Sequence, residues 1–244
     1  MLTIDSPPLN LFDLPLVAAL GDALDEIESL PPRGLLIRAE GKVVSGGVAV
    51  DVFQGLAAAR ARRLFEEWLG LTHRVEALPF PTVFAAHALC LTAAFELALA
   101  CDLVVAAASA RFGLVEVVIG VTPSMGGTQR LAARAGSGRA LELIMTGELF
   151  DATTLERWNV VNRVFPDADF ATASRELAQR LADGPTLAHA ATKRVVRAFE
   201  RGGVPGADDV LPEVAAALLE TDDARRAIES FLAEGPGRAR HHGS

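Results

Sequence analysis

The stretch "LCLTAAFELALACDLVV" (89–105) decides the fold, because it joins a buried helix to a buried strand with almost no polar residue between them. Residues 92–100 are rich in Ala and Leu, which favour a helix, and residues 102–107 form a short apolar run typical of a buried strand. Glu96 stands inside the helical run. An unpaired buried carboxylate is costly unless it is hydrogen-bonded, paired or protonated, so this residue is the first candidate for a function.

Apolar segments before this stretch extend the alternation of strands and helices. Residues 33–41 and 79–87 are typical of buried strands, and residues 42–47 are typical of another short strand that ends in a glycine turn. Residues 53–78 have the spacing of an amphipathic helix. Its predicted core positions are Phe65, Leu69, Leu71, Val75 and Leu78. Because strands and helices interleave, the sequence predicts an α/β fold.

The character of the chain changes after Pro166. Four segments with helical patterns follow, with no strand between them: residues 169–182, 185–200, 211–220 and 222–234. The sequence therefore predicts an α/β core over residues 1–166 and a C-terminal helical region over residues 167–244.

Composition narrows the classes of partner and compartment. The 244 residues are 50% hydrophobic and carry a net charge of -8, which argues against nucleic acid or an anionic membrane as a partner. No basic leader and no apolar run of about 18 residues is seen, so no signal peptide or membrane span is expected. Cys90 and Cys101 have no metal-ligand spacing with a His and are typical of buried thiols in a reducing compartment. We expect a cytoplasmic protein without a metal site.

A second isolated acid, Glu116, stands in the apolar segment "FGLVEVVIG" (112–120). Two carboxylates that face one pocket could hold a water molecule and move protons. Because two nearby acids repel each other when both are ionised, their pKa values separate, and one of them can stay protonated near neutral pH. Alternatively, each acid is bonded to backbone groups or to an arginine, with Arg111 and Arg130 as candidate partners. The pattern alone leaves both interpretations open.

Two glycine-containing segments are candidates for ligand binding. In "VVSGGV" (43–48), the residues Ser45, Gly46 and Gly47 could bring backbone N–H groups close to a ligand, or they could form an ordinary turn. In "PSMGGTQRLAARAG" (123–136), Met125 and Gly126 could cradle a polar group. The same residues could equally begin a helix with Thr128 as its cap. Residues 88–96 add a strand end before a helix, whose first N–H groups are free to stabilise an oxyanion.

The segment from Ala110 to Pro166, which includes "FGLVEVVIGVTPSMGGTQRLAARAG", closely resembles the enoyl-CoA hydratase/isomerase family, the crotonases. The resemblance extends through "CDLVVAAASA", "VVSGG" and "TKRVVRAFE", and covers roughly residues 8–232. It implies a crotonase-like spiral of ββα units with a C-terminal helical domain. It also implies assembly as a homotrimer or a hexamer.

The resemblance further implies a chemistry. The backbone N–H groups of Val48 and Ala93 match the oxyanion hole that binds the thioester oxygen of an acyl-CoA, and Glu96 and Glu116 match the two hydratase carboxylates. The expected protein is an enoyl-CoA hydratase, a lyase of fatty acid metabolism that adds water across the C2=C3 double bond. The CoA thioester is the substrate, and no cofactor is implied. The alternatives are isomerisation, decarboxylation or thioester hydrolysis by the same site, or a non-catalytic acyl-CoA-binding paralogue.

Three departures from the family pattern fall close to these residues. The glycine run before the helix is replaced by "TAA" (92–94), the usual Asp after the first oxyanion donor is Ala49, and the usual Pro before the second glutamate is Val115. The first two departures, the loss of the glycine run and of the Asp, motivate the non-catalytic alternative.

Overall fold

The computed structural model describes residues 1–244, which form two compact units. The first unit contains Met1–Pro31, Leu36–Leu78 and Thr82–Arg175. The second contains Pro32–Leu35, Pro79–Pro81 and Glu176–Ser244.

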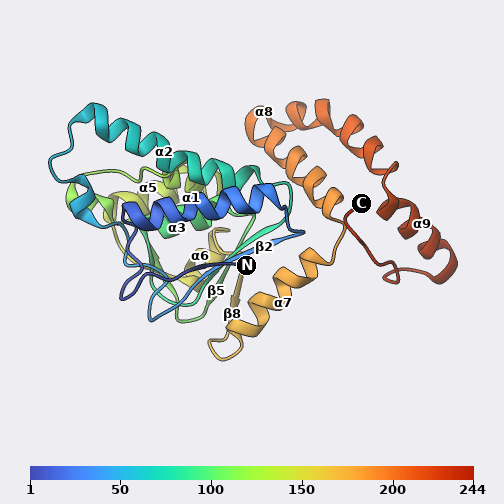
Figure 1. The fold of residues 1–244 in the computed structure, drawn as a ribbon, viewed down its shortest axis with the longest axis horizontal. Coiled ribbons are helices and arrows are strands. Elements are labelled where there is room, and N and C mark those ends of the chain that lie inside the picture. Colours follow the sequence, from blue (N-terminus) through green and yellow to red (C-terminus); the bar gives the residue numbers. More distant parts are fainter. The chain divides into compact units, whose positions relative to one another are not determined.

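A five-stranded sheet forms the centre of the first unit (Figure 1). Its strands, in spatial order, are β1 (Leu2–Ile4), β2 (Leu35–Ala39), β3 (Thr82–Ala86), β5 (Leu103–Ala107) and β8 (Arg163–Phe165). The pairs β1–β2, β3–β5 and β5–β8 are parallel. Parallel strands are covered on both faces, which explains why these segments are continuous apolar runs. The strand predictions for residues 33–41, 79–87 and 102–107 are confirmed.

A small second sheet leads into the central helix. It has the order β4 (Cys90–Leu91), β6 (Arg111–Gly113) and β7 (Phe150–Asp151). Strand β4 runs directly into helix α3 (Thr92–Ala100), all nine residues of which are buried. The helix predicted over residues 92–100 is therefore confirmed, and Glu96 lies in the interior of the unit.

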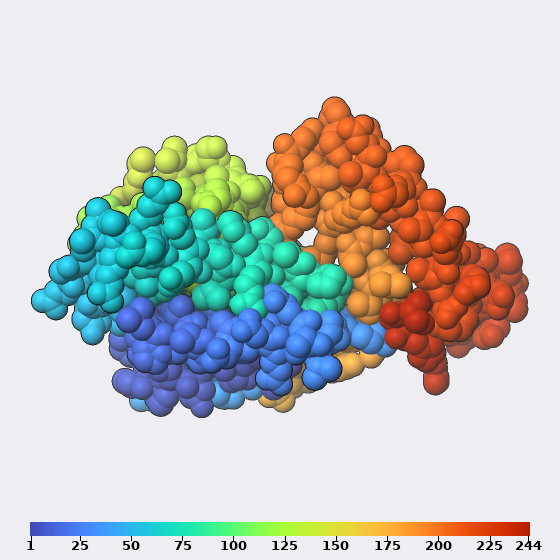
Figure 2. All heavy atoms as spheres, turned by 45° about the horizontal axis from the view of Figure 1, so that its top comes forward, coloured from blue at the N-terminus to red at the C-terminus, as the bar shows by residue number.

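Five more α-helices and two short 3₁₀ helices complete the first unit. They are α1 (Leu14–Ser29), α2 (Ala58–Ala77), α4 (Gly127–Ala135), α5 (Ser137–Thr146), α6 (Ala152–Arg157), η1 (Val50–Phe53) and η2 (Glu116–Ile119). Helices α1 and α2 run side by side, as Figures 1 and 2 show in dark blue and teal. Arg74 of α2 joins them by ion pairs to Asp25 and Glu28 of α1.

Two details of the predicted fold are wrong. Residues 42–47 do not form a strand, because the Gly46–Gly47 turn leaves this segment only isolated bridges, such as Ser45 with Cys90. The helix predicted from Phe53 begins at Ala58, because η1 and a left-handed Gly55 (φ 69°) precede it.

The C-terminal helices are α7 (Phe170–Ala182), α8 (Thr186–Leu218) and α9 (Asp222–Glu234). Gly203 has a non-helical backbone (φ 63°, ψ -161°) and divides α8 into two pieces, so the four predicted helical segments are confirmed. Thr221 caps α9 by accepting a hydrogen bond from the Ala224 N–H at 3.2 Å. None of the helices combines the length and the apolar character needed to span a bilayer.

Candidate active site

A cavity of about 250 Å³ lies inside the first unit and contains both isolated acids. Most of its wall is apolar, contributed by η1, α2, η2 and the segments around them: Val48, Val50, Phe53, Phe65, Trp68, Val115, Val118, Ile119, Val121 and Met125. The rest of the lining is Gly46, Thr92, Glu96, Glu116, Thr122 and Ser124. The carboxylates are thus the only ionisable groups in a mainly apolar lining, which strengthens the electrostatic interaction between them.

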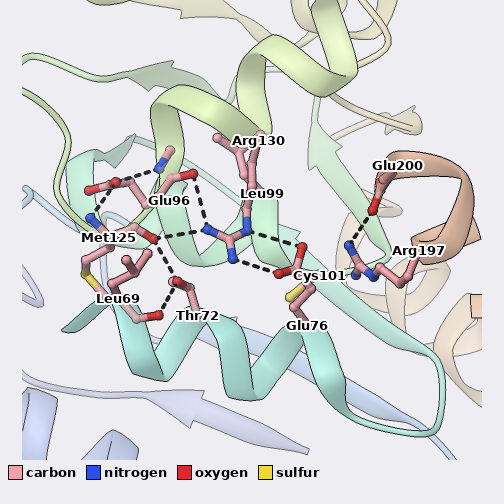
Figure 3. Close-up of polar contacts among 12 residues, drawn as sticks. Leu69, Thr72, Glu76, Glu96, Leu99, Cys101, Met125, Arg130, Arg197 and Glu200 are labelled. Atoms are coloured by element: carbon pink, nitrogen blue, oxygen red, sulfur yellow. Dashed lines mark hydrogen bonds and ion pairs between the residues drawn. The ribbon is translucent and has the colours of Figure 1, made fainter. Parts of the chain in front are cut away.

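Glu96 projects from α3 and is held by the backbone that precedes α4. Its Oε2 accepts hydrogen bonds from the N–H groups of Met125 at 2.8 Å and Gly127 at 2.7 Å (Figure 3). Burial raises the pKa of Glu96 to about 7, while these N–H groups and the charge of Arg130 oppose the rise. Because the N–H groups bind the ionised form, Glu96 can carry its charge near neutral pH.

Glu116 is the first residue of η2 and has a different environment. Its Oε2 is buried and has no hydrogen-bond partner. Burial, and then the charge of Glu96, raise the pKa of Glu116 to about 8. Because the two carboxyls repel each other when both are ionised, the pair holds a proton near neutrality. The hydrogen bonds to Glu96 favour its ionised form, and therefore favour Glu116 as the carrier of that proton.

The segment that binds Glu96 is itself fixed by side chains from two helices (Figure 3). Thr72 of α2 donates its hydroxyl proton to the Met125 carbonyl at 2.7 Å, and Arg130 of α4 donates to the Gly126 carbonyl at 3.2 Å. Arg130 also pairs with Glu76 of α2 at 2.8 Å. Arg130 is therefore not the ion-pair partner of an active-site acid, although it fixes the backbone that holds one.

Replacing Arg130 by Met is expected to lower the free energy of unfolding by about 3 kcal/mol, because it removes a partly buried ion pair to Glu76 together with the hydrogen bond to the Gly126 carbonyl. Urea unfolding of the two proteins measures this difference. The control is Arg62→Met, which removes an exposed ion pair with Glu66 and should unfold at the same urea concentration as the wild type. Equal losses in both variants would contradict a structural role for the Arg130 pair.

The backbone at Val48 exposes an unused N–H group. In the parallel bridge between Phe12 and Val48, Phe12 bonds the Gly47 carbonyl at 2.8 Å and the Ala49 N–H at 3.1 Å. The N–H of Val48 therefore points away from Phe12 and has no acceptor within the chain. Gly47 permits this path with φ 108°, a conformation that favours glycine.

The Ala93 N–H is a second unused donor. Ala93 is the second residue of α3, where N–H groups have no partner within the helix. Leu91, the N-cap residue, has no side chain that could accept from it. Ala93 is fully buried and directly follows Thr92, which lines the cavity, although Ala93 itself is not part of the lining.

The structure separates the remaining candidate residues into two groups. Gly46 and Met125 line the cavity, whereas Ser45 is used within the chain: its hydroxyl donates to the Asn10 carbonyl at 2.7 Å and accepts from the Gly47 N–H at 3.0 Å. Gly126 is the left-handed N-cap of α4, so Thr128 is not its cap.

Arg111 and two aromatic residues have positions that the sequence did not predict. Arg111 pairs with Asp151 at 3.8 Å and not with a cavity acid. Phe53 and Trp68 form part of the cavity wall, with ring centroids 6.1 Å apart. Their roles had no signal in the sequence, because an apolar residue that lines a cavity follows the same helical spacing as one that fills a core.

Comparisons with known proteins identify the family of this chain. A model of the family described as enoyl-CoA hydratase/isomerase matches residues 1–236. A Mycobacterium tuberculosis protein named as a probable enoyl-CoA hydratase is 32% identical over 205 residues, which are 82% of this chain and 78% of that protein. A Mycosarcoma maydis protein named enoyl-CoA isomerase/hydratase is 31% identical over 201 residues, 82% of this chain and 73% of that protein.

A solved structure extends the likeness to the whole fold. An enoyl-CoA hydratase from Bacillus anthracis superimposes with a TM-score of 0.90 at 25% sequence identity, over 99% of this chain and 95% of that chain. The crotonase-like fold is thereby confirmed. On the family match over nearly its whole length, the chain belongs to the enoyl-CoA hydratase/isomerase family.

Proposed function

We propose that this protein is an enoyl-CoA hydratase, which adds water across the C2=C3 double bond of a 2-enoyl-CoA. The observation that carries the proposal is the pair of carboxyls in one apolar cavity. One is bonded to two backbone N–H groups, and the other has a buried Oε2 without a hydrogen-bond partner. A hydratase needs a base and an acid at the same time, and these two environments favour opposite protonation states.

In the proposed reaction, ionised Glu96 accepts a proton from water as the water oxygen forms its bond to C3. The electron pair of the double bond moves toward C2 and the thioester, which gains enolate character. Protonated Glu116 then supplies a proton to C2. The product is a 3-hydroxyacyl-CoA, and proton exchange through a water molecule restores the starting charges.

The N–H groups of Val48 and Ala93 are proposed to bind the thioester oxygen during this step. Each N–H group lacks an acceptor in the chain, so the substrate does not have to displace an existing hydrogen bond when it binds. The developing negative charge would strengthen both bonds, which is how an oxyanion hole lowers a barrier. The apolar wall around Phe53, Phe65 and Trp68 suits a hydrocarbon acyl group.

Isomerisation is a second candidate, favoured by the unpartnered Oε2 of Glu116. A single carboxyl can remove a proton from one carbon of a 3-enoyl-CoA and return it to another. That reaction would require Glu116 and the oxyanion hole, but not Glu96.

The test is turnover of purified protein on 2-enoyl-CoA thioesters of increasing length and on 3-enoyl-CoA thioesters, with products identified by mass spectrometry. We expect the wild type to convert 2-enoyl-CoA into a product heavier by one water molecule, and Glu96→Gln to lose this activity. Isomerised product that persists in Glu96→Gln would favour the second candidate. Tight binding of acyl-CoA without turnover of any substrate would support a non-catalytic protein and overturn both.

The pH dependence of hydration is expected to be bell-shaped, with its maximum between the two raised pKa values. Below a pKa of about 7, protonation of Glu96 removes the base; above a pKa of about 8, ionisation of Glu116 removes the acid. Values of kcat/KM from pH 5 to 10 measure the two limbs as apparent constants of the pair. A rate that is flat through this range would contradict the assignment.

A homotrimer or a hexamer is proposed as the assembly, and the cytoplasm as the compartment. In the first unit, apolar side chains of η2 and α5 are exposed, including Val118, Ile119 and Met145. In the second unit, Phe231 and Leu232 of α9 are exposed as well. Exposed apolar groups of this size favour association with another subunit. Light scattering of the purified protein measures the number of subunits.

A further inference from the structure

Thr92, at the start of α3, has a backbone conformation that its residue type disfavours. Its φ is 45°, in the left-handed region. The other non-glycine residues with positive φ are Asn10 and Asn159, and Asn tolerates this region, whereas a β-branched residue there is an outlier. Strained residues of this kind cluster at functional sites, where the surrounding structure holds them in place.

The side chain of Thr92 has an unmet hydrogen bond. It lines the cavity beside Glu96, only 6% of it is exposed, and its Oγ1 is buried without a partner. A buried hydroxyl without a partner is unfavourable, so this group is suited to a bond that forms only when a ligand fills the cavity.

Thr92 also lies between the two proposed oxyanion donors. Its Oγ1 is 2.8 Å from the position that a Cβ atom would occupy on Gly47, which directly precedes Val48. On the other side, Thr92 directly precedes Ala93 in the chain. Oγ1 is therefore close to Gly47, the residue before Val48, and belongs to the residue before Ala93.

We propose that the Thr92 hydroxyl is a third donor to the thioester oxygen, added to the N–H groups of Val48 and Ala93. This inference rests on the proposed function for the identity of the ligand, an acyl-CoA thioester. The hydroxyl keeps its proton and forms no covalent bond. Its hydrogen bond strengthens as the oxygen gains negative charge, so Thr92 contributes to kcat as well as to binding.

Three variants separate the hydroxyl from the backbone strain. Thr92→Ser keeps the hydroxyl, Thr92→Val keeps the β-branched shape without it, and Thr92→Gly removes the hydroxyl and relieves the strain. We expect Thr92→Val and Thr92→Gly to lower kcat for hydration by about ten- to a hundred-fold, and Thr92→Ser to keep most of it. Thr92→Gly should nevertheless unfold at a higher temperature than the wild type.

The control is Thr128→Val. Thr128 also has a buried hydroxyl without a partner, but it does not line the cavity. This variant should keep the wild-type kcat. If Thr92→Gly were both more stable and fully active, Thr92 would have only a structural effect and the proposal would be overturned.

A spectroscopic measurement tests the contact without any turnover. Butyryl-CoA with a ¹³C-labelled thioester carbonyl has no double bond to hydrate, and each donor to its oxygen lowers the carbonyl stretching frequency. We expect bound butyryl-CoA to absorb at a higher frequency in Thr92→Val than in the wild type or Thr92→Ser. Equal frequencies in all three proteins would overturn the proposal. A shift in a protein that hydrates no enoyl-CoA would support the contact while rejecting the hydratase assignment.

Discussion

Replacing Glu116 by Gln is expected to lower kcat for hydration by about 10²- to 10⁴-fold, the usual contribution of a positioned acid or base. Gln has nearly the same shape and is also uncharged, so the cavity and the binding of the thioester should change little. It has no acidic proton to supply to C2. Steady-state kinetics should therefore show a large loss in kcat with a small change in KM.

Stability against pH shows whether the Glu116→Gln protein is still folded. In the wild type, burial raises the folded-state pKa of Glu116 to about 8 from a model value of 4.5, so the folded state keeps a proton that the unfolded state releases. This contribution to stability is lost as pH rises through that window. Gln does not titrate, so the variant should gain stability relative to the wild type from about pH 4.5 to about pH 8.

Glu148→Gln is the matched control for the loss of activity, because Glu148 is an exposed acid. It should have wild-type kcat at every pH. Full hydratase activity in Glu116→Gln would show that Glu116 is not the acid, whatever the state of the control.

Replacing Gly47 by Ala is expected to lower kcat by about 10²- to 10³-fold, the cost of losing one oxyanion donor. A Cβ atom there would lie 2.8 Å from Thr92 Oγ1 and 3.4 Å from its Cγ2, and alanine also disfavours the φ of 108°, so the Gly47 backbone or the Thr92 side chain would have to shift. A shift of the Gly47 backbone would also displace the N–H of the next residue, Val48. Measurement of kcat and of the affinity for butyryl-CoA should show losses in both.

Gly41→Ala separates this displacement from simple backbone strain. Gly41 has φ 91°, close to the 108° of Gly47, but a Cβ atom on it would meet nothing within 4 Å. Both variants should lose stability, because neither backbone suits alanine. Only Gly47→Ala should lose activity beyond that. Similar kinetics in the two variants would contradict an oxyanion role for Val48.

Much of the architecture was predictable because its buried elements have simple patterns. Strands β3 and β5 are short apolar runs, and α3 is an unbroken run of helix-forming residues. The errors fell on residues 42–47 and on the start of α2, where glycine conformations and isolated bridges determine the path. Such features depend on contacts with distant segments, and local patterns do not encode them.

The candidate site was predictable to a different extent. Glu96 and Glu116 stood out because carboxylates are costly in apolar surroundings, and the structure places both in one cavity. Arg130 was one of two candidate partners for the acids, and the sequence does not reveal that it pairs with Glu76, because that pair joins residues 54 positions apart on α4 and α2. The replacement of a glycine run by "TAA" (92–94) marked this position as unusual, but the positive φ of Thr92 itself depends on contacts with distant residues such as Gly47.

The complete enclosure of α3 has a consequence for how this scaffold can diverge. Every residue of that helix is buried, and apart from Thr92 and Glu96 none of them lines the cavity, so changes at its other positions disturb the core that holds the acid. The facing wall of the cavity comes from η1, α2 and η2, where Val50, Val118 and Ile119 still reach solvent. New substrate ranges can therefore arise by exchanging residues of this outer wall while the reacting groups stay fixed, so that selection can act on specificity and on chemistry separately.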